Sequence, residues 1–167
     1  MCNAVSGTVV NNYSGHTVVN NVVRKDSVRQ NVRPILDQGR YEGPTRDGVP
    51  HGVGSFFWPD GTLYEGEFSD GVIEGRGRKT YFDRVYEGDF HNNLREGRGK
   101  LIFRNGDVSE GEFKGDMRDG VLHDSCRDDD LRAYTYDGEY ANDERQGRGE
   151  FRYSDGETYR GDVVKGF

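Results

Sequence analysis

The chain has 167 residues and a formal net charge of −7; only 32% of its residues are hydrophobic, although 12% are aromatic and 25 are glycine. This composition is too polar for a large spherical core and favours an elongated body, and it contains no run of about 18 apolar residues that could cross a membrane as a helix. The two cysteines, Cys2 and Cys126, are too far apart in sequence to indicate a disulfide framework or clustered metal ligands, so a reducing, intracellular compartment is the expected environment.

Residues 1–40 are predicted to form a basic arm that is extended or partly disordered. They carry five basic and two acidic side chains, whereas residues 41–167 have a net charge of −10. Residues 8–23 contain VVNN twice and are rich in β-branched residues, which favour strands. This segment could fold back as a hairpin, add to the sheet edge of a partner, or remain a flexible tail until bound. We expect the arm to dock on an acidic partner. The side chains expected to make this contact are Arg24, Lys25, Arg29 and Arg33.

From residue 41 onward, a five-residue phrase returns at regular intervals. YEGEF at 64–68 returns as YEGDF at 86–90, and more loosely as SEGEF, YDGEY and YRGDV, in steps of 22 to 27 residues. A nearly fixed period of this length is typical of repeat architectures. The first residue of each copy is numbered position 0 below. These residues are Tyr41, Tyr64, Tyr86, Ser109, Tyr136 and Tyr159.

The spacing within each copy predicts two antiparallel strands. Tyr, Gly and Phe recur at positions 0, 2 and 4, and glycine and aromatic residues recur at positions 11, 13 and 17, so each set shares one face of a strand. Position 7 holds Gly, Asn or Asp, which tolerate the left-handed backbone of a turn, and several copies are joined by DG or NG. We therefore predict an all-β, elongated, single-layer antiparallel array of consecutive β-hairpins. Roughly eleven strands at about 4.8 Å spacing would make a ribbon about 50 Å long.

Charged residues alternate with the glycines and should occupy the opposite face. Pairing position 2 with position 13 sets glycine opposite glycine, and it also sets Glu65 opposite Arg78 and Glu67 opposite Arg76. Such pairs are worth roughly 0.2 to 1 kcal/mol each, so we expect them to tune the register more than the stability. The alternative is that these charges only keep a solvated face soluble.

The pattern Y-x-G-x-F, then G-x-x-x-G-x-G, then an aromatic residue and a DG turn resembles the MORN repeat (membrane occupation and recognition nexus). The resemblance covers residues 41–167, as about five and a half units. It implies consecutive hairpins with a groove lined by tyrosine, phenylalanine and glycine. Proteins of this family serve mostly as scaffolds, among them ciliary radial-spoke and axonemal components, cytoskeletal proteins, membrane tethers, and appendages to lipid kinases or methyltransferases.

The first, fourth and last copies depart from this pattern. Pro44 interrupts the first copy, as is typical of a terminal repeat, and the last copy supplies only half a unit. In the fourth copy, Ser109, Leu122 and Cys126 stand where the pattern has tyrosine, glycine and an aromatic residue. The fourth copy also carries an insertion at residues 123–132, which we expect to bulge from one edge of the ribbon.

Part of the aromatic face is predicted to bind a partner. A single-layer sheet has no second layer to cover this face, so some rings should stay accessible to an amphipathic helix or an extended peptide. The alternative is that the rings form only a core. The predicted groove residues are Trp58, Tyr64, Phe68, Tyr81, Tyr86, Phe90, Phe103, Phe113, Tyr140 and Tyr153.

The sequence predicts no catalytic, metal or cofactor site. Asp124 and residues 128–130 lack the glycine turn and the terminal glutamate of a calcium loop, and we expect them to form a solvated loop. The histidines are scattered, and Cys126 has no base arrangement near it in sequence, so an unreactive thiol is expected. The glycines precede strands rather than helices, which argues against a phosphate-binding loop. The charge of −10 on the repeats argues against nucleic acid and makes membrane contact an unfavoured interpretation.

These observations favour a non-catalytic scaffold that clamps a partner segment in its aromatic groove. The resemblance implies a cytoplasmic, cytoskeletal location, with the axoneme of a cilium or flagellum as the specific expectation. There the chain would be a radial-spoke or doublet-associated part of a larger complex, and the basic arm could contact tubulin or other axonemal proteins. The alternatives are a peripheral membrane module that binds acidic phospholipids and a structural component of a large virus particle.

Overall fold

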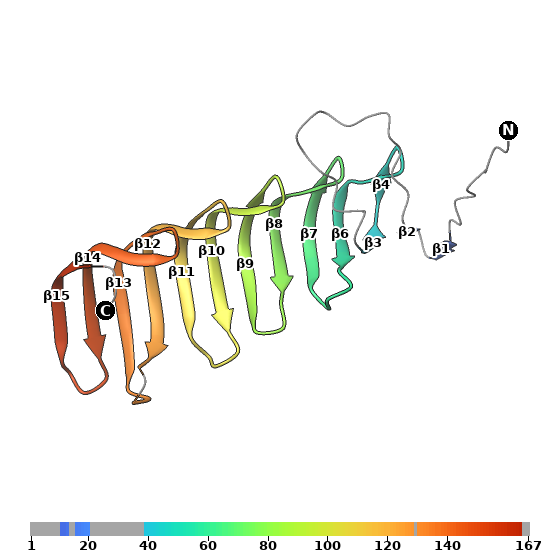
Figure 1. The fold of residues 1–167 in the computed structure, drawn as a ribbon. Helices are drawn as coiled ribbons and strands as arrows, with labels where there is room; N and C mark the ends of the chain where they lie inside the picture. The colour runs from blue at the N-terminus through green and yellow to red at the C-terminus, as the bar shows by residue number, and fades with distance from the viewer. Residues whose placement is uncertain (1–10, 14–15, 21–38, 129, 165–167) are drawn as a thin grey trace, which may run out of the picture.

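The computed structural model describes residues 11–13, 16–20, 39–128 and 130–164. Throughout this part of the chain the regular structure is β-strand, no helix is present that could cross a membrane, and thirteen strands form one antiparallel sheet (Figure 1). In sheet order the strands are β1 (Asn11–Tyr13), β2 (His16–Asn20), β3 (Arg40–Gly43), β6 (Gly52–Phe57), β7 (Leu63–Ser69), β8 (Val72–Thr80), β9 (Arg84–His91), β10 (Leu94–Phe103), β11 (Val108–Lys114), β12 (Met117–Arg127), β13 (Ala133–Ala141), β14 (Glu144–Tyr153) and β15 (Thr158–Val163).

Neighbours in the sheet are also neighbours in sequence, except where β4 (Thr45–Arg46) and β5 (Val49–Pro50) form a small separate hairpin inside the first unit. Every pairing is antiparallel, and the strands follow one another as an open series of hairpins (Figure 1). The predicted all-β array of consecutive hairpins is therefore confirmed.

Two strands precede the repeats. β1 pairs with β2, and β2 pairs with β3, with Val19 opposite Tyr41. Of the alternatives for residues 8–23, the structure shows a hairpin in the part that it describes. The four basic residues of the arm, at positions 24, 25, 29 and 33, lie outside the described residues, so docking of the arm remains a prediction.

The predicted glycine pairing is confirmed, and it makes room for a tyrosine ring. Gly66 lies opposite Gly77 in the second unit. The ring of Tyr64 lies against this glycine pair, because a Cβ atom built on Gly77 would stand 2.3 Å from the ring. The hydroxyl of Tyr64 donates a hydrogen bond to the backbone carbonyl of Glu67 at 3.1 Å, three residues ahead. The same bond recurs from Tyr86 and Tyr136.

The register of the hairpin shifts just after this glycine, and this corrects one predicted charge pair. Glu65 lies opposite Arg78, as expected, with 3.8 Å between their charged groups. Glu67 falls at the register shift, and its carboxylate accepts a hydrogen bond from the backbone N–H of Arg76 at 3.0 Å. The Arg76 side chain instead pairs with Asp89 of the next unit at 3.2 Å. The expected side-chain pair of Glu67 with Arg76 was therefore wrong.

The core is a row of interlocking rings along one face of the sheet. Phe90 at position 4 meets Tyr86 of its own unit and Tyr64 of the preceding unit edge to face, with centroids 5.2 and 5.1 Å apart. Phe68 does the same with Tyr64 and Tyr41. Such contacts add about 0.5–1.5 kcal/mol each beyond the buried area. The tyrosines at position 0 of the first, second, third and fifth units have no exposed surface.

The turns inside successive units are linked by a second set of hydrogen bonds. Asn93 at position 7 donates its N–H to the carbonyl of Ile73 in the preceding unit at 3.0 Å, and its side chain accepts the N–H of Ile73 at 2.7 Å. Asp116 and Asp143 make the same two bonds in the following units. At the first junction the partner is Pro50, which has no N–H, and position 7 there is a glycine that only donates.

The insertion in the fourth unit lengthens a strand pair instead of bulging out. β12 continues to Arg127 and pairs with β13 up to Ala133, so among the described residues only 128 and 130–132 remain outside the strands. This loop lies at the same edge as the other turns between units (Figure 1). The expected bulge was wrong because most of the extra residues extend the ladder.

Replacing Gly77 by alanine should destabilise the array by about 3 kcal/mol, the upper end of the cost of overpacking, because the new Cβ meets a fully buried ring. Gly106→Ala is the control, since no atom lies within 4 Å of its Cβ and only its positive φ adds strain, of about 1 kcal/mol. Urea unfolding followed by the fluorescence of Trp58 measures both losses. Equal losses would show that the ring does not set the requirement for glycine.

Candidate partner-binding groove

The structure divides the ten predicted groove residues into two sets. Six are at most 4% exposed and belong to the core, so a partner cannot reach their side chains in this structure. They are Tyr64, Phe68, Tyr86, Phe90, Phe113 and Tyr140. The other four, all at position 17, pack against the core and stay partly exposed. They are Trp58, Tyr81, Phe103 and Tyr153, and they are called the ring row below.

Part of the cover over these rings comes from the residue at position 9, which lies beside the register shift of the hairpin. In the third unit this residue is Arg95, whose guanidinium carbon lies 5.5 Å from the ring centroids of both Tyr86 and Phe113. Asp116 of the next turn holds Arg95 by an ion pair of 3.2 Å. Burial also raises the pKa of Tyr86 well above its ordinary value, so its hydroxyl remains a hydrogen-bond donor. Sequence reasoning missed this cover because it treated the strands as flat.

Three of the four rings of the ring row have a positive charge close to them. Lys79 places its Nζ atom 4.6 Å from the ring centroid of Trp58 and 5.3 Å from that of Tyr81. Burial lowers the pKa of the Lys79 ammonium group. Arg132 stacks over Tyr153 at 3.8 Å. Each cation–π contact of this kind is worth about 0.5–2 kcal/mol, so these rings are sites at which a cation is stabilised.

Two departures in the fourth unit compensate for each other. Ser109 supplies no ring at position 0, and Leu122 replaces the glycine on which a ring would lie. Leu122 is 2% exposed, and its Cγ atom would stand 2.8 Å from a Cβ on the facing Gly111. The leucine therefore fills the space left by the missing tyrosine ring.

A carboxylate is buried beside this leucine, where sequence reasoning had placed a solvated loop. Asp124 is only 1% exposed. It accepts hydrogen bonds from the hydroxyl of Ser109 at 2.6 Å, from Arg145 at 2.8 Å and from the hydroxyl of Tyr140. The sequence did contain a signal that this residue would be buried. Asp124 lies at position 15 of its unit, and three other units have an apolar side chain at this position, Phe56 in the first.

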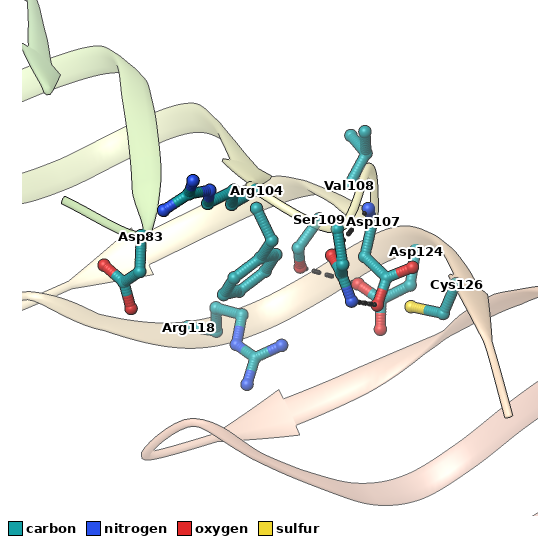
Figure 2. A pocket seen from close by; sticks show the side chains of 10 residues that line it. Asp83, Arg104, Asp107, Val108, Ser109, Arg118, Asp124 and Cys126 are labelled. Carbon is teal, nitrogen blue, oxygen red and sulfur yellow. Dashed lines mark hydrogen bonds between the residues drawn. The ribbon is translucent and has the colours of Figure 1, made fainter. Parts of the chain in front are cut away.

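A pocket of about 370 Å³ opens beside this cluster, and both Phe103 and Cys126 line it. Cys126 is the residue that replaces an aromatic ring at position 17, so the pocket marks the gap in the ring row. Figure 2 shows Asp124 and Cys126 on one side of the pocket and Arg104 on the other. Burial raises the pKa of the Cys126 thiol, which disfavours the reactive thiolate. The remaining lining residues are Asp83, Asn105, Asp107, Val108, Ser109 and Arg118.

Asp128 and His123, which also belong to this region, have hydrogen-bond partners. Asp128 accepts the backbone N–H of Arg132 at 2.8 Å, and His123 contacts Asp137 at 2.6 Å. Among the residues that the structure describes, no three His, Cys, Asp or Glu side chains are grouped so that they could hold a metal ion.

The sequence model of the MORN repeat matches five segments of the chain. They are residues 41–63, 64–84, 86–108, 110–121 and 136–158. Together these segments cover more than half of the chain, and the match in the fourth copy is the shortest and stops before the insertion. The matched segments include the position-0 residues Tyr41, Tyr64, Tyr86 and Tyr136 and the four rings of the ring row.

The chain is also similar to part of the protein alsin. It is 31% identical over 93 residues to alsin from Homo sapiens and from Pan troglodytes, which is 52% of this chain and 6% of those proteins. Against alsin from Rattus norvegicus the identity is 31% over 91 residues. The chain thus spans a small fraction of the length of these relatives.

Replacing Asp124 by asparagine should cost about 1.5–3 kcal/mol, because it removes the charged acceptor of Arg145, whose side chain is only 20% exposed. The matched control is Asp137→Asn, which breaks the exposed pair with Arg152 and should cost less than about 1 kcal/mol. Both losses are read from urea unfolding curves of the full chain. A loss for Asp124→Asn no larger than that of the control would contradict the role assigned to the buried carboxylate.

Proposed function

Because the chain belongs to the MORN-repeat family, we propose that it is a non-catalytic scaffold that binds a segment of a partner protein along the ring row. MORN repeats are modules of protein or membrane interaction, and the family is generally non-catalytic. Within this general role, the ring row is the surface that would contact the partner protein. The observation that carries the proposal is that the tyrosines at position 0 of the first, second, third and fifth units are buried, while a second series of rings remains partly exposed.

The ring row has the chemistry of an interaction surface. Trp58 and the tyrosines Tyr81 and Tyr153 combine large apolar area with polar groups, a combination enriched at protein interfaces. They lie at the ends of strands in a sheet whose units are held together by ring contacts and by hydrogen bonds between turns. Because the sheet is already ordered, the protein should lose little conformational entropy when a partner binds. An amphipathic helix or an extended peptide could contact several units at once.

The cellular setting is the more specific part of the proposal. We place the scaffold in the cytoplasm, in a cytoskeletal assembly, and specifically in the axoneme as a radial-spoke or doublet-associated component. The family resemblance supports this setting. The net charge of +3 on residues 1–40 supports docking of the arm on an acidic surface such as tubulin.

One observation favours a second candidate function, peripheral contact with a membrane. Phe82 in the turn between β8 and β9 is 88% exposed, and Leu131 in the loop between β12 and β13 is 77% exposed. Both connections lie at the same edge of the sheet (Figure 1). Apolar tips of this kind can enter the headgroup region, but the charge of −10 on residues 41–167 opposes binding to anionic lipid.

A peptide-display selection on the purified chain tests the scaffold proposal. Peptides selected on the wild type should bind the double variant Trp58→Ala, Tyr81→Ala at least tenfold more weakly, because two adjacent rings of the ring row are lost. Phe82→Ala should leave the affinity unchanged, since this ring lies outside the row. Circular dichroism checks that each variant is folded.

The opposite pattern would favour the membrane. If Phe82→Ala and Leu131→Ala release the chain from floating vesicles, while the ring-row variant keeps full peptide affinity, the scaffold proposal fails. Microscopy of the tagged full chain in ciliated cells tests the cellular setting. If the tagged chain is absent from the axoneme, that part of the proposal fails.

A further inference from the structure

The second unit shows what the space between neighbouring rings of the ring row can hold. Its position 15 is Lys79, whose ammonium group lies against the rings of Trp58 and Tyr81, at 4.6 and 5.3 Å from their centroids. The protein thus supplies a cation of its own to this space.

In the fourth unit the charge at this place is inverted. Position 15 is Asp124, and position 17 is Cys126, so a carboxylate and a small thiol replace the ammonium group and the ring. The pocket of about 370 Å³ lies here, with Phe103 of the third unit as one wall. Cations lie over Trp58, Tyr81 and Tyr153, but within the described part of the chain none lies over Phe103.

We propose that this pocket receives a basic side chain, arginine or lysine, of the partner segment, and this inference rests on the proposed function. The pocket has the two features that such a side chain needs. Phe103 and Val108 offer apolar surface to its aliphatic stem and a ring face to its charged end. Asp107 also lines the pocket and brings a carboxylate to the charged end, whereas Asp83, another lining residue, is paired with Arg84 at 3.4 Å.

The two arginines of the pocket do not cancel this preference. Arg118 is paired with Asp143 at 3.1 Å and stacked on Tyr140 at 4.6 Å, so its charge is already compensated. Arg104 stacks over Phe82 at 5.4 Å, and Figure 2 shows it across the pocket from Asp124. Asp107, by contrast, accepts its side-chain hydrogen bond from a neutral group, the amide of Asn105, at 2.8 Å.

The charge of the whole array acts in the same direction. Residues 41–167 carry a net charge of −10, which attracts a basic segment over long range and raises its rate of encounter. A partner with basic side chains between apolar ones would therefore match both the ring row and the pocket.

The test uses N-acetyl-arginine N-methylamide as the probe and its citrulline counterpart, which has the same shape but no charge, as the control. Amide chemical shifts of the isotope-labelled full chain are followed by NMR during titration. The arginine probe should produce saturable shifts at residues 103–109 and 124–126, and the citrulline probe should bind at least tenfold more weakly. Asp107→Asn should weaken binding of the arginine probe at least threefold. Asp47→Asn, the same change at an exposed turn of the first unit, should have no effect.

Equal binding of the two probes, shifts spread over the whole acidic surface, or no saturable shifts at the pocket would each overturn the inference. The result is separable from that of the proposed function because the probe is too small to contact the other rings of the ring row. Arginine binding at the pocket, combined with unchanged peptide binding by the Trp58→Ala, Tyr81→Ala variant, would keep the pocket and remove the ring row as the partner site. The reverse combination would keep the ring row and remove the basic side chain.

Discussion

The fold depends on a tyrosine ring lying across a pair of glycines. A single-layer sheet has no second layer to bury its apolar face, so each unit must cover its own ring. The facing glycines, such as Gly66 and Gly77, leave a slot in the sheet surface, and the tyrosine hydroxyl is satisfied by a carbonyl three residues ahead. The phenylalanine at position 4 then joins this ring to the ring of the preceding unit. A chain with so few hydrophobic residues can therefore form a continuous core, but each unit with a tyrosine at position 0 needs glycine where the ring lies.

This solution separates the aromatic residues into two groups with different environments. The buried rings at positions 0 and 4 belong to the core. The rings at position 17, at the end of the second strand of each hairpin, are only partly covered. Removing a ring from the first group would disturb the fold, and removing one from the second would chiefly change the surface. The array accepts a different residue at position 17, because Cys126 stands there in the fourth unit and the sheet continues through it.

The sequence predicted those parts of the structure that follow from the spacing of residues along the chain. The period, the alternation along each strand and the glycine pairing required only the positions of Tyr, Gly and Phe, and all three are confirmed. The register shift within the hairpin was not predicted, because counting does not show that Gly75 takes a positive φ and that Glu67 bonds to the backbone of Arg76 instead of to its side chain. The cover of Tyr86 and Phe113 by Arg95, which lies beside such a shift, was missed for the same reason. Asp124 was misplaced for a different reason: composition suggested an acidic loop, although its position in the repeat already placed it on the core face.

The irregular fourth unit gives the array something that regular repetition cannot provide. Identical units present identical surfaces, so a partner bound to them would be free to shift along the ribbon by one unit at little cost. In the fourth unit the ring of position 0 is replaced by Ser109 and Leu122, and a buried carboxylate at Asp124 binds three donors in fixed geometry. The edge-to-face series that links Tyr41 to Phe113 is interrupted there, and the pocket opens at the same place. A pocket at one irregular unit of a periodic surface would fix the register of a bound segment, because only the alignment that places the matching side chain in that pocket is favoured. The departures from the repeat in this unit are therefore the features that would let a scaffold of this kind distinguish one alignment of its partner from another.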